Sequence, residues 1–182
     1  MVQSRKKFLK TASLSFFGLL AFPDFSLKDN DEIDPVVVHA EEGETFWIGT
    51  RNSPLTIKVS KVKNGSNAVS FCTEEIASQE GIPVHKHLNE DELIFVHSGE
   101  GILTVGDQEI TVKTGSVALI PKNVWHGVKN TGKETFIMVF SYSPAGFEGY
   151  FREFGSPAGT NWQPKSKEEY FKLNQKWGIV YK

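Results

Sequence analysis

The sequence predicts an all-β fold, a sandwich or barrel of many short strands followed by two short helices. Segments rich in Val, Ile, Thr and aromatic residues recur at regular spacing over residues 36–145, separated by Gly, Pro and Asn. No apolar pattern of helical length occurs in this region. The 14 Phe and 4 Trp favour an aromatic-rich β interior, and 182 residues suffice for one domain with short extensions.

The first 25 residues have the order of an export signal. Residues 5–7 form a cationic head, and residues 12–22 form an apolar run shorter than the about 20 residues that a spanning helix needs. The stretch is similar to a twin-arginine export motif, with Lys6 at the place of the second arginine. Export by the general secretory route, an uncleaved anchor and a buried helix are the alternatives. We expect an exported protein, periplasmic or extracellular, with a linker over residues 26–35.

The predicted β-barrel spans residues 36–145. Gly106 and Asp107 form a tight turn between two strands, which makes this hairpin the clearest in the chain. Residues 146–182 form a C-terminal extension, in which helical spacing predicts two short helices lying over one end of the barrel. The predicted strands are residues 36–40, 45–49, 55–59, 68–74, 93–97, 102–105, 110–112, 117–120 and 136–142, and the predicted helices are residues 147–154 and 165–177.

Composition limits the classes of partner. The net charge is −2 and no basic cluster is large enough to follow a phosphate backbone, so we expect no nucleic-acid partner. Cys72 is the single cysteine, which rules out a disulfide within the chain. No activating neighbour lies near it in the sequence, so we interpret it as a small buried hydrophobe.

A candidate metal site lies between Gly81 and Asn130, where four of the five histidines occur. His85 and His87 point to the same face of a strand, because successive side chains alternate. Glu92 can follow a tight turn and face the same interior from the next strand, where His126 can join it. Three imidazoles and one carboxylate suit a divalent first-row metal with coordination positions left open. The alternative is a set of hydrogen-bonded polar residues on a barrel wall.

The other acidic and histidine residues of this region are weaker candidates. Asp91 faces the opposite way from Glu92 by alternation, and Glu90 falls on the turn, although both compete for the carboxylate role. His97 follows Glu92 by five residues and faces outward in an unbroken strand. His39 has no candidate partner nearby in the sequence, and we interpret it as structural.

Two segments carry spaced Gly, His, Glu, Pro and Asn residues: Gly81-x3-His85-x-His87-x4-Glu92-x6-Gly99 and Gly115-x5-Pro121-x-Asn123-x2-His126-x3-Asn130. They resemble the two motifs of the cupin family. Asn123 stands where the second motif usually has glycine, which is tolerable because Asn readily takes the left-handed conformation. The opening Gly81 lies two residues closer to the histidines than usual. Residues 143–153 are similar to a segment of small cupins described as quercetin-dioxygenase-like.

The resemblance implies a single-domain jelly-roll β-barrel with a metal inside one end, usually as a homodimer. The expected cofactor is one divalent transition metal ion, Fe, Mn or Ni, with Zn also compatible, held by His85, His87, Glu92 and His126.

The leading functional hypothesis is a metal-dependent oxygenase acting on a small enolic or phenolic compound. Glu92 could alternate between metal ligand and general base. The alternatives are a non-catalytic cupin that binds a sugar or other small molecule, and a metal-dependent isomerase or lyase. A pocket for an aromatic ligand is a further hypothesis, with plain core as the alternative; its candidates are Phe71, Trp125, Phe136, Met138 and Phe140.

Overall fold

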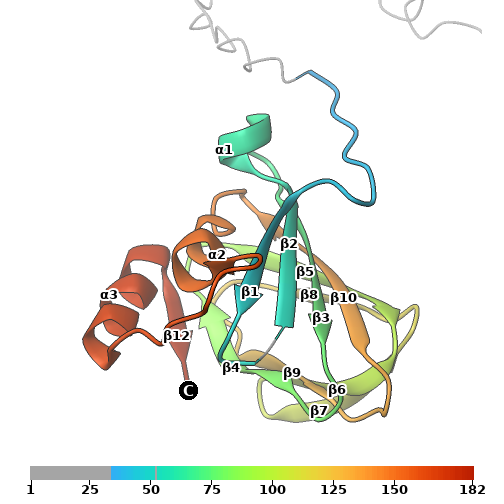
Figure 1. Cartoon of the computed structure of the whole chain (residues 1–182). Coiled ribbons are helices and arrows are strands. Elements are labelled where there is room, and N and C mark those ends of the chain that lie inside the picture. The colour runs from blue at the N-terminus through green and yellow to red at the C-terminus, as the bar shows by residue number, and fades with distance from the viewer. Residues whose placement is uncertain (1–33, 52) are drawn as a thin grey trace, which may run out of the picture. The chain divides into compact units, whose positions relative to one another are not determined.

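The strands of the chain form two antiparallel sheets in a jelly-roll arrangement (Figure 1). This computed structural model describes residues 34–51 and 53–182. The predicted export segment, residues 1–25, and most of the predicted linker lie outside the described residues. Among the helices that the model describes, none is long and apolar enough to cross a membrane.

Among the described residues, the first sheet has seven strands in the order β11-β1-β2-β3-β10-β5-β8, and the second has five in the order β12-β4-β9-β6-β7. The first contains β1 (Glu44–Ile48), β2 (Ser53–Val59), β3 (Phe71–Ile76), β5 (Asp91–Ser98), β8 (Val117–Ile120), β10 (Phe136–Ser143) and β11 (Ser156–Pro157). The second contains β4 (Gly81–His87), β6 (Glu100–Val105), β7 (Gln108–Lys113), β9 (His126–Asn130) and β12 (Ile179–Tyr181). The helices are α1 (Lys61–Asn64), α2 (Gly149–Phe154) and α3 (Lys167–Trp177).

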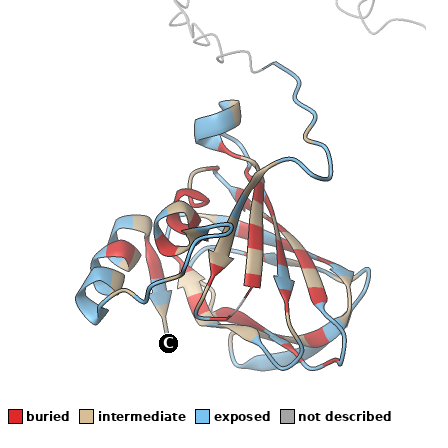
Figure 2. Ribbon diagram, viewed as in Figure 1, coloured by how far each residue is buried: buried red, intermediate tan, exposed pale blue. Residues whose placement is uncertain are grey.

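Alternation along the strands separates the interior from the surface. In β5, Glu92, Ile94 and Val96 are buried, whereas the residues between them are exposed. Figure 2 shows the same alternation of buried and exposed positions along neighbouring strands. A strand that follows period two places one face of side chains inside the barrel, which is the pattern that the sequence predicts.

Two turns have the backbone conformations expected from their residues. The predicted hairpin is confirmed: Val105 pairs with Gln108 across Gly106, whose φ is +63°. Asn123 has a φ of +67°, so it takes the left-handed conformation in place of the usual glycine of the second motif.

The strand predicted at residues 36–40 is not formed. Val37 is 76% exposed, and this segment pairs with no strand that the model describes. Lys58 Nζ instead donates hydrogen bonds to the carbonyl oxygens of His39 and Ala40. A short β-branched run without a neighbouring strand leaves its backbone groups to other partners, so the prediction from residue type was wrong here.

The C-terminal residues contain both predicted helices and two short strands, β11 and β12. A capping box at Ser166 and Glu169 begins α3, and Gly178 with a φ of +63° ends it. β12 then pairs with β4, which places Tyr181 opposite His85 (Figure 1). The sequence pattern did not predict this strand, because three residues are too short for a period-two signal.

Candidate metal centre

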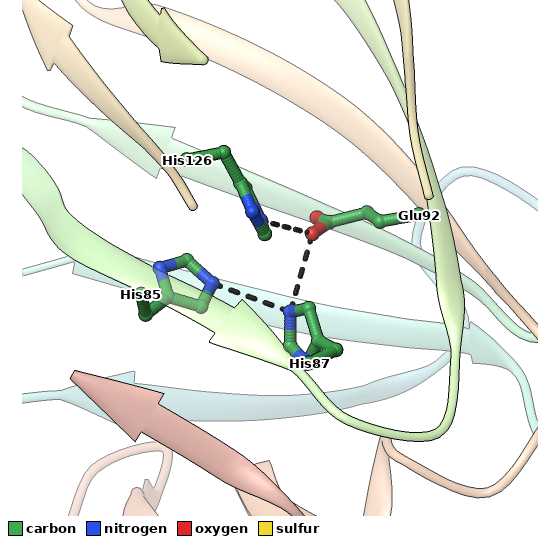
Figure 3. A group of neighbouring side chains, drawn as sticks. All are labelled: His85, His87, Glu92 and His126. Carbon is green, nitrogen blue, oxygen red and sulfur yellow. Dashed lines mark hydrogen bonds and ion pairs between the residues drawn. The ribbon is translucent and has the colours of Figure 1, made fainter. Parts of the chain in front are cut away.

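Three strands bring His85, His87, Glu92 and His126 together (Figure 3). The first two histidines lie on β4, and His126 lies on β9, with His85 and His126 as register partners. Glu92 comes from β5 of the other sheet. All four side chains are buried, and their ligand atoms lie within 4.8 Å of one another. The two histidines that alternation places on one face of β4 thus lie beside a carboxylate from the opposite sheet.

The distances between these ligand atoms are short. His126 Nε2 lies 2.8 Å from Glu92 Oε2, and His87 Nε2 lies 3.3 Å from the same oxygen. His85 Nε2 lies 3.2 Å from His87 Nε2. Nitrogen and carboxylate atoms that converge on one point need a proton or a cation between them, so the donor set fits a divalent transition metal ion.

Backbone carbonyls orient two of the imidazoles. His85 Nδ1 lies 2.8 Å from the Pro83 carbonyl oxygen, and His126 Nδ1 lies 3.0 Å from that of Val124. When Nδ1–H donates to each carbonyl, the Nε2 lone pair of the neutral ring faces the cluster, as a metal ligand requires. His87 Nδ1 is buried and has no hydrogen-bond partner among the described residues.

The protonation states of three of these residues follow from their surroundings. Burial, together with the charges of His126 and His87, lowers the pKa of His85 to about 3. Burial would raise the pKa of Glu92, but hydrogen bonds from His126 and His87 hold this pKa well below its ordinary range. Burial would lower the pKa of His126, whereas the hydrogen bond and charge of Glu92 raise it. At neutral pH Glu92 is therefore ionised and His85 neutral, which are their ligating forms.

A cavity of about 20 Å³ adjoins the cluster. Such a volume holds about one or two water molecules. The aromatic part of its wall comes mainly from β10 and the segment that includes α2, and its polar part includes groups outside the cluster. The lining residues that matter below are Arg51, Glu74, Phe140, Tyr142, Phe147 and Tyr181.

Two of the five residues predicted to form an aromatic pocket line the cavity beside the cluster, and the other three do not. Met138 and Phe140 line the cavity beside the cluster. Phe71 is 41% exposed, because it alternates with buried Cys72 on β3. Phe136 is fully buried but lines a different, apolar cavity. The Trp125 ring lies 4.8 Å from Lys86 Nζ; Lys86 alternates with His85 and His87, so this contact lies outside the barrel.

The remaining candidates lie away from the cluster. Asp91 is exposed, and its Oδ1 accepts a hydrogen bond from the Lys122 backbone N–H at 2.9 Å. His39 and His97 are exposed, and Glu90 follows β4 in the connection to β5. Cys72 is buried, and burial raises the pKa of its thiol. Alternation thus favours Glu92 over Asp91, as expected from the sequence.

Sequence reasoning missed two charged residues beside the cluster. Arg51 follows β1, and Glu74 lies on β3; both are buried and line the cavity. Glu74 lies two residues from Cys72 and two from Ile76, so alternation along the strand indicates that all three side chains point inward. Arg51 carried no such signal, because a charged residue in a turn usually faces solvent.

Part of the chain, including three strands of this arrangement, is similar to known proteins. Residues 72–142 match the family model described as a cupin domain. An uncharacterized protein of Methanocaldococcus jannaschii is 30% identical over 66 residues, which are 36% of this chain and 53% of that protein. The chain therefore spans about half the length of this curated relative.

Solved structures share the fold at low sequence identity. A Thermotoga maritima protein described as a predicted oxalate decarboxylase has a TM-score of 0.54 and 20% identity, covering 60% of this chain and 99% of that one. The protein KdgF from a Halomonas species has a TM-score of 0.55 and 11% identity, covering 63% and 98%. An RmlC-like cupin from Shewanella frigidimarina has a TM-score of 0.50 and 19% identity, covering 59% and 88%. At these identities the likeness concerns the fold.

Proposed function

We propose that this chain, which is a small member of the cupin superfamily, holds one divalent transition metal ion and is a metal-dependent oxygenase for a small enolic or phenolic compound. The observation that carries the proposal is the convergence of four buried ligand atoms within 4.8 Å beside a cavity. Mixed imidazole and carboxylate ligands suit Fe, Mn or Ni, with Zn also compatible.

The protein's own contribution is orientation and exclusion of water. Such an ion, when bound, supplies Lewis-acid activation of a substrate oxygen. The carbonyls of Pro83 and Val124 fix the His85 and His126 rings. The aromatic rings of Tyr142 and Phe147 pack against His87, with ring centroids 4.9 and 4.3 Å away, and shield this side of the site from solvent.

Glu92 is the residue best placed to hold a proton. Its Oε2 lies within 3.3 Å of both His87 and His126, at the edge of the cavity. A carboxylate displaced from a cation by an anionic substrate can accept the proton that the substrate loses. We therefore assign Glu92 a double role as ligand and general base.

The cavity favours one part of the proposed substrate class. A volume of about 20 Å³ holds about one or two water molecules, so the residues that line the cavity would have to move for any substrate. A compact enolic compound requires less movement than a phenolic ring.

Oxygen uptake tests the oxygenase proposal. Metal-loaded protein is screened in an oxygen electrode against small enolic and phenolic compounds, beside His126→Ala as the metal-site control. Oxygen consumption that requires both the compound and His126 is the expected result. Turnover of a compound without oxygen uptake would instead indicate an isomerase or lyase, and binding of an unchanged compound would indicate a binding module; either result contradicts the oxygenase.

We also propose that the protein is exported to the periplasm or beyond. The support is the cationic and apolar order of residues 1–25. Fractionation of cells that express the full chain, with and without these residues, tests this: the full chain should leave the cytoplasm and the truncated chain should remain there.

A further inference from the structure

A buried ion pair lies in the same cavity as the candidate metal ligands. Arg51 is 6% exposed and Glu74 is 1% exposed. Arg51 Nε donates to Glu74 Oε1 at 2.5 Å, and Nη2 donates to Oε2 at 2.9 Å. Ser53 Oγ donates a further hydrogen bond to Oε1. The ion pair is thus bidentate, and it joins the turn after β1 to β3.

The guanidinium keeps donors that this pair does not use. A guanidinium carries five N–H groups, of which Glu74 accepts two, and no partner for the other three occurs among residues 34–51 and 53–182. Because Arg51 lines the cavity, an oxygen-bearing ligand there would satisfy these donors.

Two tyrosines that pack against the histidines line the same cavity as this arginine. The Tyr142 ring centroid lies 4.9 Å from that of His87, and the Tyr181 centroid lies 5.6 Å from that of His85. Both tyrosines line the cavity, as Arg51 does. Tyr181 Oη shares a hydrogen bond with Tyr150 Oη at 3.3 Å. The wall from the cluster to Arg51 is therefore lined with groups that can bind oxygen atoms.

The charges in the cavity leave one positive charge unmatched once a divalent ion is present. Glu74 balances Arg51, and Glu92 offsets one of the two charges of the ion. A ligand with one negative charge would complete the balance. A planar carboxylate matches the guanidinium fork and the small volume, whereas a phosphate group is larger and carries about −1.5 to −2 charges at neutral pH.

We propose that the cavity recognises a compact carboxylic acid in its ionised form, with Arg51 as the residue that binds the carboxylate. The proposal rests on the metal-dependent function above and narrows its substrate class to small enolic acids. Arg51 is a specificity residue in this account, and Glu74 positions it. A purely structural ion pair would instead affect folding stability without distinguishing charged from neutral ligands.

Matched ligands, compared in the wild type and in variants of the Arg51–Glu74 pair, separate these two roles, because the metal ion alone also favours an anion. Acetate and acetamide have the same number of non-hydrogen atoms and differ in charge. NMR titration of the metal-loaded full chain gives the Kd of each, and we expect acetate to bind at least about tenfold more tightly. The metal content of each sample is measured by mass spectrometry.

Removal of the whole pair avoids leaving an unpaired buried charge. In Arg51→Met/Glu74→Met the affinity for acetate should fall about tenfold, while that for acetamide and the metal content stay near the wild-type values. Arg152→Met/Glu44→Met, which removes an Arg–Glu pair outside the cavity, is the matched control and should leave both affinities unchanged. Arg51→Lys keeps the positive charge but loses the fork, and should weaken acetate binding severalfold even if the double variant does not fold.

The outcomes distinguish this inference from the proposed function. Wild-type protein with its metal that binds acetate and acetamide equally would overturn the carboxylate proposal alone. Acetate affinity that survives in the folded, metal-containing pair variant would overturn it as well. Wild-type protein that takes up no metal would instead contradict the metal-dependent function on which the inference rests.

Discussion

At the level of single residues, the spacing of the candidate ligands in the sequence indicated which side chains come together. His85 and His87 share a face because they are two positions apart, and Glu92 and His126 follow in segments that the motifs specify. The sequence therefore predicted which four side chains meet. Arg51 could not be predicted in the same way, because its partner Glu74 is 23 residues away and pairs with it only after β1, β2 and β3 assemble.

Because Glu92 is proposed to act both as a metal ligand and as a general base, its substitution should affect metal content and turnover to different extents. Glu92→Gln keeps an oxygen ligand but removes the base, so turnover should fall at least about 100-fold while metal content falls less than in His126→Ala. Metal analysis and rates on the substrate found by oxygen uptake measure the two effects. Unchanged turnover in Glu92→Gln would rule out the role as a base.

Substitution of Asn130 should cause a large loss of folding stability. This side chain is fully buried; its Nδ2 donates to the carbonyl oxygens of Ile76 and Glu134, both at 2.9 Å, and its Oδ1 accepts from the Gly132 N–H at 3.0 Å. Asn130→Ala leaves these groups without partners and should lower the free energy of unfolding by about 3 kcal/mol.

Urea unfolding measures this loss, with exposed Asn67→Ala as the control. The control should change the free energy of unfolding by less than about 0.5 kcal/mol. An equal, small effect in both variants would contradict the bridging role of Asn130.

At the level of elements, residue type and period-two alternation predicted strands such as β5, β8 and β10, but failed at residues 36–40 and at β12. β5 and β10 are eight residues each and pair on both sides, so their patterns are clear. Residues 36–40 have β-branched composition but no strand partner that the model describes, and β12 has only three residues. Pairing between distant segments decides such cases, and local composition does not contain it.

The ion pair between Glu44 of β1 and Arg152 of α2 should contribute to folding stability in a pH-dependent way. Arg152 donates to both oxygens of Glu44, at 3.0 and 2.7 Å, and this hydrogen bonding lowers the pKa of Glu44 below its ordinary value of 4.5. A lowered pKa means that the contribution is complete above about pH 4.5 and is lost as the pH falls through the folded-state value.

Glu44→Gln should therefore cost about 1 kcal/mol in urea unfolding at pH 7 and almost nothing at about pH 3. Exposed Glu109→Gln is the control and should have little effect at pH 7. A cost for Glu44→Gln that is equal at both pH values would contradict the ion pair as its cause.

At the level of the whole molecule, the outer face of the first sheet carries an apolar patch. Leu93 and Phe95 on β5 pair with Leu119 and Val117 on β8, and these four side chains are 38–66% exposed. We propose that two copies of the chain associate through this face, because exposed apolar patches of this kind mark interaction surfaces.

Light scattering tests the homodimer. Wild type should have twice the 20.4 kDa mass of the chain, and Phe95→Lys/Leu119→Lys should have the single-chain mass. Val62→Lys, on the exposed side of α1, is the control and should leave the dimer intact. A monomeric wild type, or a dimer that survives both lysines, would contradict this surface.

Metal content is the most direct test of the central claim. Protein purified without an affinity metal is analysed by mass spectrometry beside His85→Ala/His126→Ala, with circular dichroism as the check that both are folded. The account predicts about one Fe, Mn or Ni ion per wild-type chain and none in the variant. Wild-type protein without metal even after reconstitution, or equal metal in both proteins, would contradict a metal centre formed by His85, His87, Glu92 and His126.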